Sequence, residues 1–218
     1  MRITILPLVF IFSALIFLGS CGSVFAYENY IGQSQIHPAH PFYFLKTIRE
    51  SLELKSAGTP HIKTVRYLEF AQRRLREIKS LVKVHHEELI EPNLERYWAH
   101  LKDLNGQINI NQDNQMIEQV AKHLAILEKV YNQVTNLRAK MAIRLAMSRV
   151  VGFNTGVMNK LILNPNQTEL VRKLTLHQLK ACNFFTKEAS SSSLNEVEKV
   201  VLLERAQDCF HSVRSGFN

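Results

Sequence analysis

Strand patterns and sequence repeats are missing from this chain. No stretch of any length alternates apolar and polar residues as a half-buried β-strand does, and no segment recurs at a fixed period. Glycine and proline, which mark turns, are also few, with eight and six among 218 residues. These absences leave an all-α fold of long, antiparallel, amphipathic helices, arranged as an elongated helical bundle or a coiled-coil-like array.

Catalytic motifs are missing as well. The sequence holds no serine elbow, no glycine-rich phosphate loop and no cysteine and histidine pair at ligand spacing. The adjacent carboxylates of Glu87 and Glu88 could act as a general acid and base only in a shaped pocket, which a thin helical bundle rarely provides. We therefore expect a protein that is not an enzyme and has no cofactor; an enzyme of unrecognised type is a remote alternative.

Long apolar runs are absent except at the start of the chain, where one extends from Ile3 to Leu18 behind the charge of Arg2. Small residues follow this run, which gives residues 1–26 the three-part layout of a secretory signal. The run is shorter than the ~20 residues that a spanning helix needs, so a retained anchor is the least favoured reading.

Two processing sites compete for this signal. Cys21 has a leucine three positions earlier and small residues between, as in a bacterial lipoprotein signal, where the cysteine is lipidated. Ala26 ends an ordinary small-x-small cleavage site. Residues 27–40 then read as an extended spacer. We expect an extracytoplasmic protein, either a membrane-anchored lipoprotein or a secreted or periplasmic one.

The mature chain has enough apolar content for a core and a basic balance, with 46% hydrophobic residues and a formal charge of +8. A basic surface outside the cytoplasm can meet anionic lipids, acidic wall polymers or nucleic acid, and net charge does not choose among them. The second predicted helix carries a broad basic flank, which we expect to be a solvated face. Its members are Arg66, Arg73, Arg74, Arg76, Lys79 and Lys83.

Helical periodicity divides the rest of the chain into a helical domain of residues 41–163 and a C-terminal hairpin of residues 164–218 packed on it. A first short helix opens at Pro41, and a second covers roughly residues 61–89. The most regular stripe predicts one long helix over residues 120–145. The first helix has large apolar residues at helical spacing: Phe44, Leu45, Ile48 and Leu52.

The start of the helical domain resembles an uncharacterised domain-of-unknown-function family of bacterial cell envelopes, with a proline-aromatic-tyrosine step and a Leu-Lys pair. The resemblance rests on Pro38-Ala39-His40-Pro41-Phe42-Tyr43-Phe44-Leu45-Lys46, on Glu50, and on Ala71-x-x-Arg74-Leu75-x-Glu77. It continues more weakly to about Val150 and implies a signal or anchor and a helical extracytoplasmic domain, without an activity. His40 stands where a small hydroxyl residue is expected. We interpret the motif as structural, with Phe42, Tyr43 and Leu45 holding the first helix on the second.

Histidines are the best candidates for chemistry, since the chain has nine. An exported protein could bind copper, zinc or nickel through His37 and His40, or through His85 or His86 with Glu88. Adjacent helical residues point about 100° apart, however, so His85 and His86 do not easily share an ion, and His85 falls on the apolar stripe after Val82.

Cys182 and Cys209 form an even pair in a compartment that can be oxidising. If their helices turn near residues 190–193, the two cysteines miss register by ~12 Å at helical rise, and a disulfide needs Cα atoms within ~7 Å. Two buried thiols and a disulfide in a staggered pair therefore remain as alternatives.

The sequence thus favours a non-catalytic exported helical module that binds a protein or an envelope component. Membrane association would come from a lipid on Cys21 or an uncleaved signal. No specific nucleic-acid partner is expected, and a homo-oligomer is an open alternative. The second hypothesis is a histidine-dependent metal-binding protein of envelope stress or resistance.

Overall fold

The computed structural model describes residues 32–161, 165–191 and 193–215, and in these residues the chain forms helices and no strand. The predicted all-α class is confirmed. The predicted signal, with Cys21 and Ala26, lies outside the described residues. The α-helices are α2 (Tyr43–Lys55), α3 (Pro60–Lys83), α4 (Ile90–Gln107), α5 (Asn114–Tyr131), α6 (Leu137–Leu161), α7 (Thr168–Ala189) and α8 (Glu196–Ser215), and the 3₁₀ helices η1 (Glu87–Leu89) and η2 (Pro165–Gln167) precede α4 and α7.

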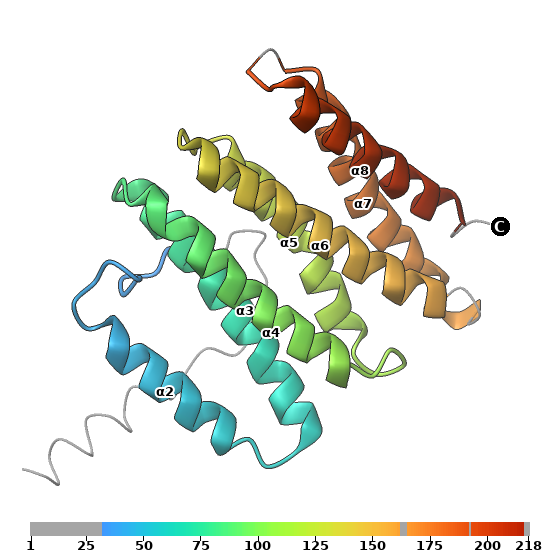
Figure 1. Ribbon diagram of the computed structural model, residues 1–218. Coiled ribbons are helices and arrows are strands. Elements are labelled where there is room, and N and C mark those ends of the chain that lie inside the picture. The colour runs from blue at the N-terminus through green and yellow to red at the C-terminus, as the bar shows by residue number, and fades with distance from the viewer. Residues whose placement is uncertain (1–31, 162–164, 192, 216–218) are drawn as a thin grey trace, which may run out of the picture. The chain divides into compact units, whose positions relative to one another are not determined.

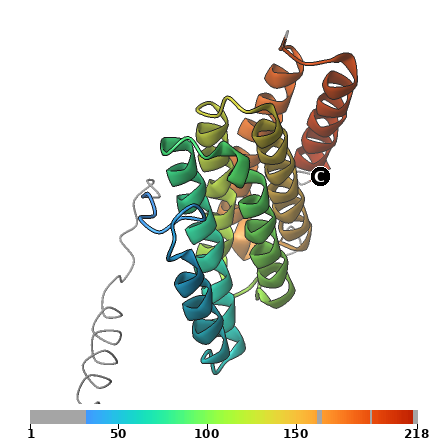
Figure 2. The same cartoon turned by 60° about the vertical axis from the view of Figure 1, so that its left-hand side comes forward.

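Three helical hairpins, α3–α4, α5–α6 and α7–α8, are stacked side by side (Figure 1). Helices α3, α5 and α7 contact one another in that order, and so do α4, α6 and α8, so the hairpins form two layers. Figure 2 shows their axes running nearly parallel. The side chains between them make one continuous hydrophobic core, and residues 31–218 form one compact unit.

Helix boundaries are set by side chains that satisfy the first backbone N–H groups. Thr59 Oγ1 accepts from the N–H of Ile62 (3.2 Å), and Pro60 occupies the first turn of α3. A capping box begins α8. Asn195 Oδ1 accepts from the N–H of Glu198 (2.9 Å), whose carboxylate accepts in return from the N–H of Asn195 (3.3 Å).

The single long helix predicted over residues 120–145 is wrong, because the chain turns between α5 and α6. Asn136 Oδ1 accepts from the N–H of Ala139 (3.0 Å) and caps α6. The carboxylate of Glu87, from η1, accepts from the N–H of Asn136 as well (2.6 Å). This cap depends on a residue that is distant in sequence, so the periodic stripe concealed the break.

Cys182 of α7 and Cys209 of α8 form a disulfide with their Cα atoms 5.5 Å apart. The register argument against a bridge was therefore wrong. Cys182 lies seven residues before the end of α7, whereas Cys209 lies thirteen residues after the start of α8. Helix α8 thus begins ~9 Å beyond the end of α7, and this stagger brings the two cysteines level.

No helix in the described ranges combines the length and the apolarity that a membrane crossing requires.

Candidate functional site

The four histidines considered as metal ligands lie in the loops before α2 and after α3. The rings of His37 and His40 are 6.4 Å apart and perpendicular, and His86 Nδ1 lies 2.9 Å from the Glu88 carboxylate. Burial, followed by the charges of His40 and His86, lowers the pKa of His37. Among the residues that the structure describes, no three histidine, cysteine or acidic side chains gather closely enough to hold a metal ion.

His85 does not continue the apolar stripe of α3, contrary to expectation. Helix α3 ends at Lys83, and His85 adopts a positive φ of 60° with its side chain exposed. The N–H of His86 donates to the carbonyl of Leu81 (2.9 Å), as in a Schellman C-cap. Histidine tolerates the left-handed conformation better than most residues, which explains why the helix can stop here without a glycine.

Helix α2 presents its apolar side to solvent. Phe44, Leu45, Ile48 and Leu52, which we call the α2 apolar face, are 56%, 53%, 53% and 60% exposed. Phe42, just before the helix, is 58% exposed as well. Figure 1 shows α2 on the outer side of α3. Of the three residues expected to hold α2 on α3, only Tyr43 does so.

The opposite side of α2 is polar and faces α3. Tyr43 and Glu50 are 9% and 8% exposed, and Lys46 and Glu53 share their side of the helix. At about 100° per residue, the centre of this polar side lies roughly 180° from the centre of the α2 apolar face. The helix is therefore amphipathic, but its charged side is the one that packs.

Two charged residues of α3 pack against the polar side of α2. Arg74 and Glu77 are 1% and 0% exposed, and a guanidinium nitrogen of Arg74 lies 2.5 Å from Glu50 Oε1 and 3.2 Å from Glu77 Oε1. Asn93 Nδ2 of α4 donates to the backbone carbonyl of Arg74 (3.0 Å). Buried charges persist only when they are paired, and here every charge meets an opposite one.

The hydroxyl of Tyr43 connects these charges. It donates to Glu77 Oε2 (3.1 Å) and accepts from the guanidinium groups of Arg74 and, at 3.0 Å, Arg96. Burial and then the Glu77 carboxylate raise the pKa of Tyr43 to about 12. The phenol therefore stays protonated and keeps its donor role.

Lys46 extends the network to the segment that precedes α2. Its Nζ lies 2.5 Å from Glu77 Oε1 and donates to Ser34 Oγ and to the carbonyl of Ile36, both at 3.1 Å. Burial lowers the pKa of Lys46. Ser34 and Ser80 of α3 exchange two hydrogen bonds, at 2.8 and 2.9 Å. The segment before α2 is thereby tied to the same helix that α2 contacts.

At the rim of the network, Arg73 lies 2.9 Å from Glu53 and 3.5 Å from Glu50. The predicted solvated flank of the second helix is therefore wrong for Arg73 and Arg74, which pair with carboxylates of α2. Three carboxylates, Glu50, Glu53 and Glu77, meet three cations, Lys46, Arg73 and Arg74. These six charges balance and are largely shielded from water. We call them the α2–α3 charge network, and they hold α2 on α3.

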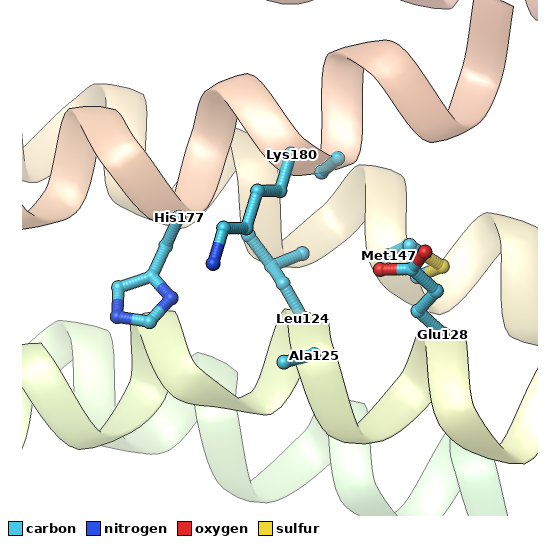
Figure 3. Close-up of a pocket in the computed structure, with 7 residues that line it drawn as sticks. Leu124, Ala125, Glu128, Met147, His177 and Lys180 are labelled. Carbon is cyan, nitrogen blue, oxygen red and sulfur yellow. The ribbon is translucent and has the colours of Figure 1, made fainter.

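A small pocket lies between α5, α6 and α7 (Figure 3). His177 and Lys180 of α7 lie over Leu124 and Ala125 of α5. The pocket between them is about large enough for one water molecule. Burial lowers the pKa of His177, with a smaller contribution from Lys180. This pocket is too small for an organic substrate.

The residues that carried the family resemblance are those that meet in the charge network. Tyr43, Lys46 and Glu50 come from the first motif, and Arg74 and Glu77 from the second. The sequence contains a signal for this arrangement: acidic and basic residues recur at helical spacing on the side of residues 43–55 opposite the apolar stripe. Charged helix faces are usually solvated, so this spacing alone does not predict burial.

Comparison with known proteins extends the resemblance to a defined segment. No curated protein and no solved structure matches the sequence. Residues 35–137 match the model of a family described as Domain of unknown function (DUF5667), a stretch that contains α2, α3, α4 and α5. The charge network lies within this stretch, so it belongs to the part of the chain that is similar to the uncharacterised DUF5667 family.

Proposed function

We propose that this chain is a non-catalytic, exported helical module that binds a component of the cell envelope through the α2 apolar face. The observation that carries the proposal is the orientation of α2. Its four large apolar side chains are each more than half exposed, while the charged side of the same helix is buried. Contiguous exposed apolar side chains mark interaction surfaces more often than scattered ones do.

The charge network supports a binding role because it fixes this orientation. Rolling α2 so that its apolar face meets α3 would take Lys46 and Glu50 to the surface, and the buried Arg74 and Glu77 would lose their ion pairs with α2 and keep only the one between them. Leaving buried charges unpaired costs several kcal/mol, about 3–5 for each broken pair. The helix therefore presents a preformed apolar surface, which lowers the entropic cost of binding.

Export is supported by two independent features. Residues 1–26 have the layout of a secretory signal. The disulfide between Cys182 and Cys209 belongs to a type of bond that persists in oxidising compartments. The absence of catalysis is an inference from the lack of catalytic motifs in the sequence.

Sedimentation with isolated cell envelopes tests the proposal. Residues 27–218 contain the whole compact unit and lack the signal, so any binding comes from the folded part. We expect this protein to sediment with envelopes of the producing cells and the double variant Leu45→Gln/Ile48→Gln to stay in the supernatant. Val197 and Val200 of α8 are 74% and 53% exposed, and Val197→Gln/Val200→Gln is the matched control. Equal sedimentation of both double variants would refute the role of α2.

A further inference from the structure

We infer that the envelope component bound by the α2 apolar face is an anionic lipid surface. This inference rests on the proposed function and names its ligand. Four features of α2 carry it: the composition of its exposed side, the sign of the charge there, its position after the signal, and its fixed orientation.

The exposed side of α2 has the composition of a helix that lies in a membrane interface. Two rows of large apolar side chains, Phe44–Ile48–Leu52 and Leu45–Ile48, face solvent, with Phe42 just before them. Hydroxyl and cationic side chains border them: Thr47, Arg49, Ser51 and Lys55. Interfacial helices combine large apolar residues with lysine or arginine in this way, burying the former among acyl chains and placing the latter among headgroups.

The charge on this side has one sign. Helix α2 contains two glutamates, Glu50 and Glu53, and both are turned toward arginines of α3. Arg49, whose side chain is 61% exposed, and Lys55 point outward. Part of the Arg49 charge is matched by Glu53, at 3.0 Å, and Lys63 adds an exposed cation in the first turn of α3. This balance favours anionic headgroups.

The same charges disfavour a second copy of the chain as the occupant. In a two-fold dimer the same patch meets itself, so Arg49 and Lys55 of one copy would approach those of the other. Like charges across an interface oppose association. A partner with negative charge around an apolar interior fits the surface better, and a lipid bilayer with anionic headgroups has both.

The position of α2 in the chain also favours a membrane. It is the first described helix after the predicted signal, and 21 residues lie between Cys21 and Tyr43. A lipid on Cys21 would therefore keep α2 within at most ~75 Å of the bilayer. A tether of this length raises the local concentration of the helix at the membrane, so even weak interfacial binding would be effective.

The α2–α3 charge network keeps the α2 apolar face oriented toward solvent before any lipid binds. Lys46, Glu50 and Glu53 hold α2 on α3 through their ion pairs, while the side chains of the α2 apolar face make no part of that contact. The helix can therefore enter an interface with its apolar side without leaving the fold.

Vesicle binding tests the inference. Residues 27–218 are mixed with vesicles of phosphatidylglycerol and phosphatidylcholine, or of phosphatidylcholine alone, and the bound fraction is measured after sedimentation. We expect binding to the anionic vesicles that weakens with salt, and at least a tenfold lower partition coefficient for Leu45→Gln/Ile48→Gln. Lys55→Gln should weaken binding to the anionic vesicles alone. Val197→Gln/Val200→Gln, with exposed valines of α8 replaced, should bind like the parent protein.

The two proposals fail in different ways. If the protein binds no anionic vesicle but still sediments with envelopes through α2, and protease treatment of the envelopes abolishes this, then the ligand is a protein and the lipid inference is wrong. Binding to vesicles that the α2 substitutions leave unchanged would also overturn it. If the protein binds neither vesicles nor envelopes, the proposed function itself fails.

Discussion

The guanidinium of Arg74 lies 2.5 Å from the carboxylate of Glu50, and this buried ion pair joins α3 to α2. Because each of the two residues has further charged or hydroxyl partners, the pair is part of a network that determines which side of α2 faces water. The exposed apolar side and the buried charged side are thus two consequences of one arrangement.

Removing one charge from the centre of this network should destabilise the fold. Glu77→Gln leaves Lys46 and Arg74 buried without their carboxylate, so we expect the free energy of unfolding to fall by about 3 kcal/mol. Urea denaturation followed by circular dichroism measures this change. Glu169→Gln is the control, since Glu169 and Arg172 form an exposed pair with the same three-residue spacing. A control that costs as much as Glu77→Gln would show that the network has no special role.

Stability should depend on pH through His123. This side chain is 1% exposed, its Nδ1 lies 3.0 Å from the Tyr97 hydroxyl, and burial lowers its pKa to about 3. The unfolded chain binds a proton near pH ~6.5, whereas the folded chain does not until about pH 3. The free energy of unfolding should therefore decrease as the pH falls from ~6.5 toward 3, by at most about 1.4 kcal/mol per pH unit from this group.

The measurement for His123 is a series of urea titrations between neutral and acidic pH. His123→Gln should flatten the slope below pH ~6.5 relative to the parent protein. Part of the slope should remain in the variant, because burial also lowers the pKa of His100, to about 4. Identical slopes in the two proteins would contradict the burial of an uncharged His123.

The disulfide should contribute stability that reductant removes. Cys182 and Cys209 are 27 residues apart, and closing a loop of this length stabilises a fold by about 3–4 kcal/mol in the chain-entropy model. We expect dithiothreitol to lower the urea midpoint of residues 27–218 and to have no effect on the double variant Cys182→Ser/Cys209→Ser. Two thiols that react with an alkylating agent in the untreated, exported protein would show that the bond does not form.

The fold class and the location of several helix starts could be predicted from local sequence. Thr59 and Pro60 are a cap and a first-turn residue in close succession, and such signals act through neighbouring atoms. The turn after Tyr131 could not be predicted, because Glu87 helps to form it from far along the chain. Periodicity alone continued the helix through that turn.

The orientation of α2 could not be predicted from the sequence for a similar reason. Helical spacing shows that Phe44, Ile48 and Leu52 share one side, but it does not show which side packs. The usual assumption places the apolar side inward, and it fails here because Arg74 and Glu77 of α3 offer matching charges. Only the packed structure shows that these charges balance.

The start of the mature protein tests the export prediction. Intact mass spectrometry of the protein from membrane and medium fractions should find a chain that begins with an acylated Cys21, or one that begins with unmodified Tyr27. The first result would give the module a lipid tether, and the second a freely diffusing form. A chain that retains Met1 in both fractions would contradict processing at either site.

Site-specific labelling measures the central claim most directly. In residues 27–218 the cysteines are Cys182 and Cys209, which are bridged, so Ile48→Cys provides a single thiol on the α2 apolar face for a polarity-sensitive fluorophore, and Val197→Cys provides the control on α8. On addition of envelopes, we predict a blue shift and protection from an aqueous quencher for the label at position 48, and no change at position 197. An unchanged spectrum at position 48, with envelopes bound, would show that the module binds through another surface.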